Sequence, residues 1–96
     1  MATIVQEAAT YTNLSATAQV FAGPGSLLGI FVASASATPT IKVWGALTAT
    51  APIIVNTFTP IAGTFYPIPA NFQAGLFVTI SGTVDCTVFW SPRFGG

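Results

Sequence analysis

The sequence predicts an all-β fold, an antiparallel jelly roll or sandwich of about eight short strands. Strand-forming segments alternate with turn-forming ones about every ten residues, and several segments place an apolar residue at every second position. No stretch repeats apolar residues with the helical period, and the one helical candidate, residues 7–9, is too short to matter. The pattern fits a jelly roll and an immunoglobulin-like sandwich equally well, because both consist of short strands with alternating faces.

Eight strands are expected, separated by turns. The strands combine β-branched and aromatic residues and are expected at residues 4–6, 17–21, 27–34, 41–44, 53–59, 64–68, 76–81 and 83–90. The turns contain Gly, Pro or Asn, which fix or free the backbone angle φ, and are expected at residues 23–25, 37–39, 50–52, 60–63, 69–71 and 81–82.

The last two expected strands show the alternation most clearly. Leu, Val and Ile occupy the even positions of residues 76–81, and Val, Cys and Val occupy those of residues 84–89. One face of each strand should therefore enter a core. Phe77 and Phe89 then fall on the outer side of their strands, as Trp44 does on its own.

Ninety-six residues make one domain at most, and the chain divides unevenly. Residues 1–16 are rich in Ala and Thr and are interpreted as an N-terminal arm, which pairs with a neighbouring subunit or is frayed. Residues 17–96 contain most of the expected strands and are interpreted as the sandwich domain. Outer aromatic residues together with a net charge of zero predict a homo-oligomer, because a neutral surface does little to repel its own copies.

The charged residues are too few for most chemistry. Glu7, Lys42, Asp85 and Arg93 are the whole set, and histidine is absent. General acid–base catalysis needs paired titratable groups, a metal site needs three or four ligands, and nucleic acid needs a basic surface. We therefore expect no enzyme, no cofactor or metal and no nucleic-acid partner, and the single Cys86 is interpreted as a small core residue.

No membrane association is expected either. The longest apolar run, residues 27–33, is far shorter than the roughly 20 residues that a spanning helix needs. No Lys or Arg precedes Lys42, so the positive region of a secretory signal is missing. Trp44, Tyr66 and Trp90 are candidates for stacking on sugars, although few amide side chains are available to assist them.

Four segments together resemble a known family. They read LGIFVAS at 28–34, PTIKVW at 39–44, IIVNTF at 53–58 and GLFVTISGTVDCTV at 75–88. In these strand patterns the chain resembles the small β-rich virion proteins of tailed bacteriophages. Members of that family are typically capsid decoration or cement proteins, folded as jelly rolls or related sandwiches and often trimeric.

The resemblance implies a structural virion protein on the capsid exterior, assembled in the bacterial host cytoplasm, that clamps neighbouring subunits of the major capsid protein. We expect the contacts to be made by the arm and by five aromatic residues: Trp44, Phe65, Tyr66, Phe77 and Trp90. One alternative is that these aromatics cover the second side of a two-sheet core. Two other functions remain open, a phage tail or fibre component that binds host glycans and an unrelated assembly protein.

Overall fold

The computed structural model describes residues 10–35 and 38–92, and every regular element in these ranges is a β-strand. The predicted all-β class is therefore confirmed. The strands are β1 (Thr10–Leu14), β2 (Ala18–Ala22), β3 (Gly25–Ala35), β4 (Thr40–Trp44), β5 (Ile53–Phe58), β6 (Thr64–Phe72), β7 (Gly75–Ser81) and β8 (Val84–Pro92).

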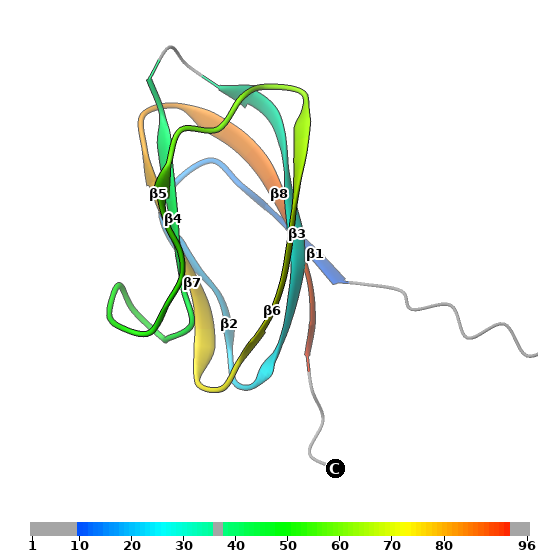
Figure 1. Cartoon of the computed structure of the whole chain (residues 1–96), viewed down its shortest axis with the longest axis vertical. Coiled ribbons are helices and arrows are strands. Elements are labelled where there is room, and N and C mark those ends of the chain that lie inside the picture. The colour runs from blue at the N-terminus through cyan, green and yellow to red at the C-terminus, as the bar shows by residue number, and fades with distance from the viewer. Residues whose placement is uncertain (1–9, 36–37, 93–96) are drawn as a thin grey trace, which may run out of the picture.

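The strands form two antiparallel four-stranded sheets packed face to face (Figure 1). Sheet A has the order β1-β8-β3-β6, and sheet B has the order β2-β7-β4-β5. Strand β1 pairs with β8, β2 with β7, β3 with β6 and β4 with β5. The chain thus runs as one long hairpin, bent between β4 and β5 and rolled into two layers. This is the strand order of a jelly roll and not of an immunoglobulin-like sandwich.

The core lies between the two sheets, and the alternation read from the sequence is confirmed. Leu76 and Val78 of β7 and Val84, Cys86 and Val88 of β8 are buried, whereas the residues between them face outwards. Burial of such side chains contributes about 1.5–3 kcal/mol each. The other well-buried members are Trp90 of β8 and residues of β1, β3, β4 and β6, namely Leu14, Leu27, Ile30, Val32, Ile41, Val43 and Phe72.

Part of the segment expected to be an arm belongs to sheet A. Residues 10–14 form β1, which pairs with β8 from Thr10 opposite Trp90 to Leu14 opposite Cys86. Leu14 is buried in the core, so these residues add a strand to their own chain. The expected strand at residues 4–6 and the helical candidate at 7–9 lie outside the described residues.

The turn predicted at residues 69–71 is wrong, because β6 continues to Phe72. Pro69, followed by Ala70 and Asn71, suggested a chain reversal, but it lies within the strand, as Pro67 does. Strand β6 is an edge strand, where proline is tolerated since its missing N–H can face away from the neighbouring strand. The reversal follows Phe72 instead, and β7 begins at Gly75.

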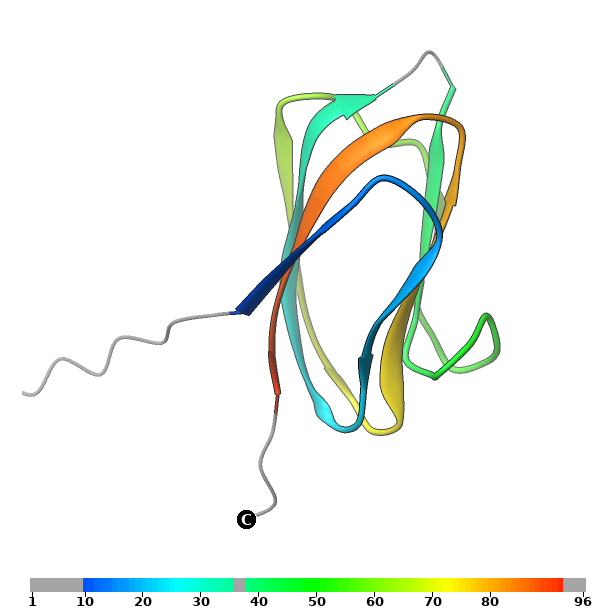
Figure 2. The same ribbon diagram turned by 180° about the vertical axis from the view of Figure 1, so that it is seen from behind.

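The loop between β4 and β5 projects from one end of the sandwich (Figure 2). Its base is closed by a hydrogen bond of 2.8 Å from the Gly45 N–H to the Pro52 carbonyl oxygen. The Gln19 side chain of β2 donates a hydrogen bond to the Leu47 carbonyl oxygen, at 2.9 Å. The loop is therefore closed at its base and tied to β2 of sheet B by one further hydrogen bond.

Candidate functional site

Ionisable groups are scattered in the described part of the chain. Lys42 lies on sheet B and Asp85 on sheet A. Across residues 10–35 and 38–92, no three His, Cys, Asp or Glu side chains gather where they could hold a metal ion. Burial, and secondarily the negative charge of Asp85, raises the pKa of the Cys86 thiol from 9.0 to about 11, so this buried thiol stays neutral at physiological pH. The most prominent feature of the described residues is instead an exposed apolar surface.

The outer side of sheet A carries a continuous apolar surface, which we call the aromatic face. It comprises Tyr11 of β1, Leu28 and Phe31 of β3, Phe65 of β6 and Phe89 of β8. Of the seven exposed large hydrophobic side chains in the described residues, four belong to this face. All but Tyr11 line a shallow hollow of about 450 Å³. An apolar patch of this kind marks an interaction surface more often than scattered hydrophobic residues do.

An irregularity in β3 builds the centre of this face. Strand β8 pairs Trp90 with Leu27 and the preceding Phe89 with Gly29, so β3 has one extra residue between them. In such a bulge two residues oppose one on the partner strand, and a side chain is redirected. The redirected residue is Leu28, which is exposed and contributes to the hollow.

Gly29 lets two aromatic rings meet across the strand that separates them. A Cβ atom at this position would lie 2.5 Å from Phe65 Cζ and 2.7 Å from the Tyr66 carbonyl oxygen. The Phe65 ring thus occupies the space above the glycine. From there it reaches Phe89 with an edge-on geometry, the ring centroids 6.1 Å apart and the planes at 63°. This arrangement is favourable for aromatic pairs.

Polar side chains border the aromatic face at both ends of its strands. At one end, the Asn13 amide donates hydrogen bonds to the Asp85 carboxylate at 2.8 Å and to the Thr87 hydroxyl at 3.3 Å. At the other end, the Ser26 hydroxyl donates to the Asn71 side-chain oxygen at 2.8 Å. An apolar centre between polar rims is the usual anatomy of a protein–protein interface.

The outer side of sheet B carries different aromatic residues. Trp44 and Phe77 lie opposite each other on β4 and β7 and are half-buried. The Trp44 indole N–H donates to the Thr79 hydroxyl at 2.9 Å, and Lys42 Nζ lies 4.3 Å from the indole ring centroid. Here the largest ring has both a hydrogen-bond partner and a cation.

The structure separates the five aromatic residues predicted to form contacts. Trp44 and Phe77 face outwards from sheet B, and Phe65 faces outwards from sheet A. Tyr66 and Trp90 point into the space between the sheets and pack against the core. The three aromatics considered for sugar stacking, Trp44, Tyr66 and Trp90, therefore do not share a surface.

Trp90 is a core residue for two physical reasons. It follows the inward alternation of β8, and its ring packs on Phe21 of β2 with the centroids 4.6 Å apart. Its indole N–H donates to the Thr12 hydroxyl at 3.2 Å, which satisfies a polar group that burial would otherwise penalise.

Tyr66 lies beside the open seam between the edge strands β5 and β6. Its ring packs edge-on against Phe58, with centroids 5.2 Å apart, and its hydroxyl accepts a hydrogen bond from the Ile61 N–H. These two rings, with Val55 and Ile68, line a second hollow of about 180 Å³.

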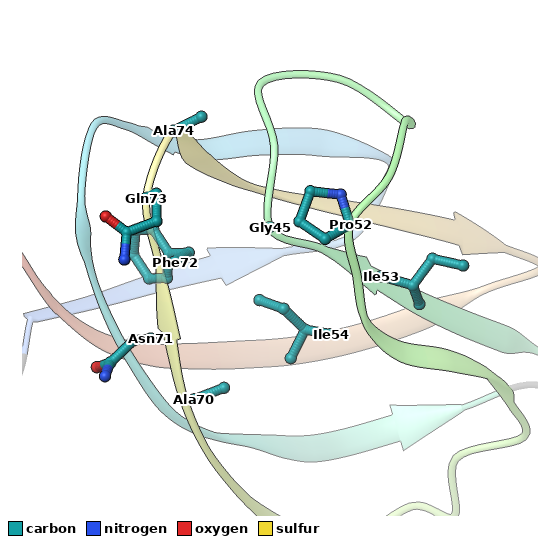
Figure 3. A pocket seen from close by; sticks show the side chains of 9 residues that line it. All are labelled: Gly45, Pro52, Ile53, Ile54, Ala70, Asn71, Phe72, Gln73 and Ala74. Carbon is teal, nitrogen blue, oxygen red and sulfur yellow. The ribbon is translucent and has the colours of Figure 1, made fainter.

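A third hollow, of about 370 Å³, lies at the end of the same seam (Figure 3). Residues 52–54 face residues 70–74 across it. Its polar side chains are the amides of Asn71 and Gln73, and the rest of the lining is apolar or backbone. The hollow contains no titratable group and offers a small apolar cleft.

Three residues of the aromatic face were missed by sequence reasoning. Alternation could have found Phe31, because it lies between the inward-facing Ile30 and Val32. Leu28 gave no signal, since only the bulge turns it outwards. Tyr11 was assigned to the arm.

No protein-family model matches the sequence, and the searches of curated proteins and of solved structures also return no match. The residues placed in the structure contain no helix with the length and hydropathy that a bilayer crossing requires.

Proposed function

We propose that this chain is a structural protein of a bacteriophage particle. It decorates the capsid exterior and stabilises the shell by binding neighbouring subunits of the major capsid protein. It acts without catalysis. Its other partners are further copies of itself, and the resemblance to phage decoration proteins favours a trimer.

One observation carries this proposal: both sheets present aromatic side chains outwards on a surface that is nearly free of charge. Lys42 and Asp85 are the only Lys, Arg, Asp or Glu residues in the described ranges. A protein that functions through buried area needs such surfaces, since each Å² of apolar area removed from water contributes about 25 cal/mol. It needs no cluster of reactive groups.

The energetics of decoration fit a small domain. A protein that binds the assembled shell more tightly than its separate subunits stabilises the shell by mass action. Many weak sites repeated over a lattice then have a large total effect. The jelly roll is used by viral capsid proteins and also by lectins and cupins, so the proposal depends on the surfaces and not on the fold alone.

The glycan-binding alternative is less well supported. A sugar stacks on an open ring face, but Lys42 Nζ lies 4.3 Å from the Trp44 ring centroid, over one face of the ring. The indole N–H is also already bonded to Thr79. Trp44 is thus held as part of the sheet surface.

Copy number in purified particles tests the proposal. Quantitative mass spectrometry should give a ratio of this chain to the major shell protein that approaches one or a simple fraction of one. A handful of copies per particle would overturn the decoration role in favour of a tail or fibre position. Complete absence from the particle would overturn the virion assignment.

Binding to particles that lack the chain tests the surfaces. Replacing Trp44 and Phe77 together by Ser should weaken binding to the shell at least several-fold while the domain stays folded. The control is Ile61→Ser, which removes an exposed hydrophobic side chain that belongs to neither outer face. Equal binding of both variants would contradict a role for sheet B in the shell contact.

A further inference from the structure

We infer that the aromatic face is a contact between two copies of this chain, packed sheet to sheet about a two-fold axis. In this contact the strands of one copy run antiparallel to those of its partner across the interface. The inference goes beyond the proposed function and does not depend on it, because it concerns the isolated protein. It also differs from the trimer that the resemblance favours, since a two-fold face is satisfied by one partner.

The composition of the face argues for a protein partner. Its centre is hydrocarbon and aromatic, with Leu28, Phe31, Phe65 and Phe89 around one hollow. The Tyr11 ring extends it across β1, directly opposite Phe89 in the register. Polar groups border this centre: Thr87 lies beside Phe31 in the register, and the two ends carry further polar side chains. Exposure to water costs the most free energy at the apolar centre of such a surface and the least at its polar rims.

The area of the face matches a small symmetric contact. Tyr11 is 69% exposed, Phe65 48%, and Leu28 and Phe31 38% each. Since large side chains present about 150–250 Å², these residues expose roughly 400 Å² of mainly apolar area per copy. Two copies with their rims then bury about 1,000 Å², which reaches the lower end of specific interfaces. We expect a reversible dimer with a micromolar dissociation constant.

A second copy fits this face because the contact brings no charge into its centre. Among the described residues, the one carboxylate on this side of sheet A is that of Asp85, which lies at a rim and accepts a hydrogen bond from Asn13. The opposite rim consists of Ser26, Asn71 and Ser91, which lie side by side in the register of β3, β6 and β8. These residues carry hydroxyl and amide donors and no charge.

Charge then selects the relative orientation of the two copies. If the strands run antiparallel across the interface, Asp85 of each copy lies over the hydroxyl and amide rim of the other. A carboxylate accepts strong hydrogen bonds from such donors. If the strands run parallel, the two Asp85 carboxylates lie at the same rim and repel each other. The antiparallel arrangement is therefore favoured.

Sedimentation of the full chain over a range of concentrations tests the contact. The unmodified protein should be a dimer at high micromolar concentration and dissociate on dilution. Phe31→Lys and Phe31→Glu should each be monomeric at the highest concentration. Phe77→Lys, on the outer side of sheet B, is the matched control and should remain dimeric.

Three outcomes would overturn the inference. They are a monomer at all concentrations, a trimer, and a dimer that Phe77→Lys dissociates while the Phe31 variants do not. A circular dichroism spectrum and a thermal melt establish that each variant is folded. Mixing the Phe31→Lys and Phe31→Glu proteins should restore a dimer. Failure of two folded variants to associate when mixed would also count against the contact.

Ser91→Lys distinguishes the two orientations. In the antiparallel arrangement the new ammonium lies near Asp85 of the partner copy, so the dimer should tighten several-fold at low salt. Added salt should remove this gain. In the parallel arrangement the two new ammonium groups lie together, and the dimer would weaken. Weaker association of Ser91→Lys would therefore overturn the proposed orientation.

Discussion

The outer faces of the two sheets both carry aromatic side chains, but only one face supplies them with polar partners. On sheet B, Trp44 donates to Thr79 and lies beneath the Lys42 ammonium group. On sheet A, Phe65 and Phe89 contact each other above a glycine. The first arrangement keeps its polar groups bonded while it remains in water. The second arrangement is stabilised most when another surface covers it and removes its apolar area from water.

The comparison teaches that aromatic content alone does not identify the kind of contact that a surface makes. Sheet A carries four outward rings and sheet B two, and the surroundings of these rings also differ. An amphipathic ring with a bonded N–H and a cation is stable in water before a shell subunit covers it. A hydrocarbon hollow bordered by polar rims is adapted to a partner.

The largest predicted effect is a difference in stability between variants of two neighbouring residues of β8, Trp90 and Phe89. Trp90→Ala should destabilise the isolated chain by about 3–5 kcal/mol, because it empties a core site. Phe89→Ala should cost far less, since its ring lies outside the sheet, but it should weaken dimerisation. Denaturant unfolding at low concentration measures the first effect, and sedimentation measures the second. Equal losses of stability would show that Phe89 is a core residue.

The second largest predicted effect is the pH dependence of the free energy of unfolding that Cys86, on the inner side of sheet A, causes. The Cys86 thiol has a pKa of about 11 in the fold against 9.0 in the unfolded chain. Below pH 9 both states bind this proton and stability is unaffected. Between pH 9 and 11 the unfolded state loses it first, so stability should fall by on the order of 2 kcal/mol.

Urea unfolding of the unmodified protein and of Cys86→Ala, followed from pH 8 to 11.5, measures this contribution. The variant should be less stable at pH 8 and should lack the part of the slope that the thiol causes. The other residues are the same in both proteins, so their contributions cancel in the difference. Parallel pH profiles for the two proteins would contradict the assignment.

The third effect tests how the rings of sheet A come together. Gly29→Ala places a methyl group where Phe65 and a backbone oxygen already lie, so it should cost about 1–3 kcal/mol. Gly45→Ala is the control, because its added methyl group would meet only ordinary contacts at 3.4 Å or more. Chemical denaturation of both variants measures the costs. A neutral Gly29→Ala would mean that the Phe65 ring does not occupy this space.

The smallest predicted effect comes from removing the polar partners of Trp44, so that the outer side of sheet B becomes more like that of sheet A. Thr79→Val removes the acceptor of the Trp44 indole N–H and should cost about 0.5–1.5 kcal/mol. Lys42→Met removes the cation and should cost about 0.5–1 kcal/mol. Thr57→Val, on β5 of the same sheet, is the control for threonine replacement. Quenching of tryptophan fluorescence should increase in both variants of interest, since the ring becomes freer.

Much of the fold could be predicted from the sequence because the strands alternate strictly. The inward set of β8 was read correctly, and the same alternation places Trp90 inside. Trp90 was predicted to be a contact residue, and the structure packs it in the core of its own chain, which was the alternative considered for these aromatics. Tyr66 likewise points inwards, since Phe65 before it and Pro67 after it face outwards.

The aromatic face itself could not be predicted, because it depends on tertiary register. Its members lie on four strands that span the chain from Tyr11 to Phe89. Leu28 reaches the face only through a bulge, and Phe65 meets Phe89 only because Gly29 lies between them. No local pattern encodes which strand will be the neighbour of which.

The strand order determines when this surface comes into existence. Strand β8 lies between β1 and β3, so sheet A has no continuous face until the last strand is in place. During synthesis the N-terminal part of the chain leaves the ribosome first. The contacts that close a jelly roll join parts of the chain that are distant in sequence. Nascent chains on one messenger RNA therefore cannot pair through Tyr11, Phe31 and Phe89 before translation has passed Pro92, and self-recognition through this face requires all four strands of sheet A.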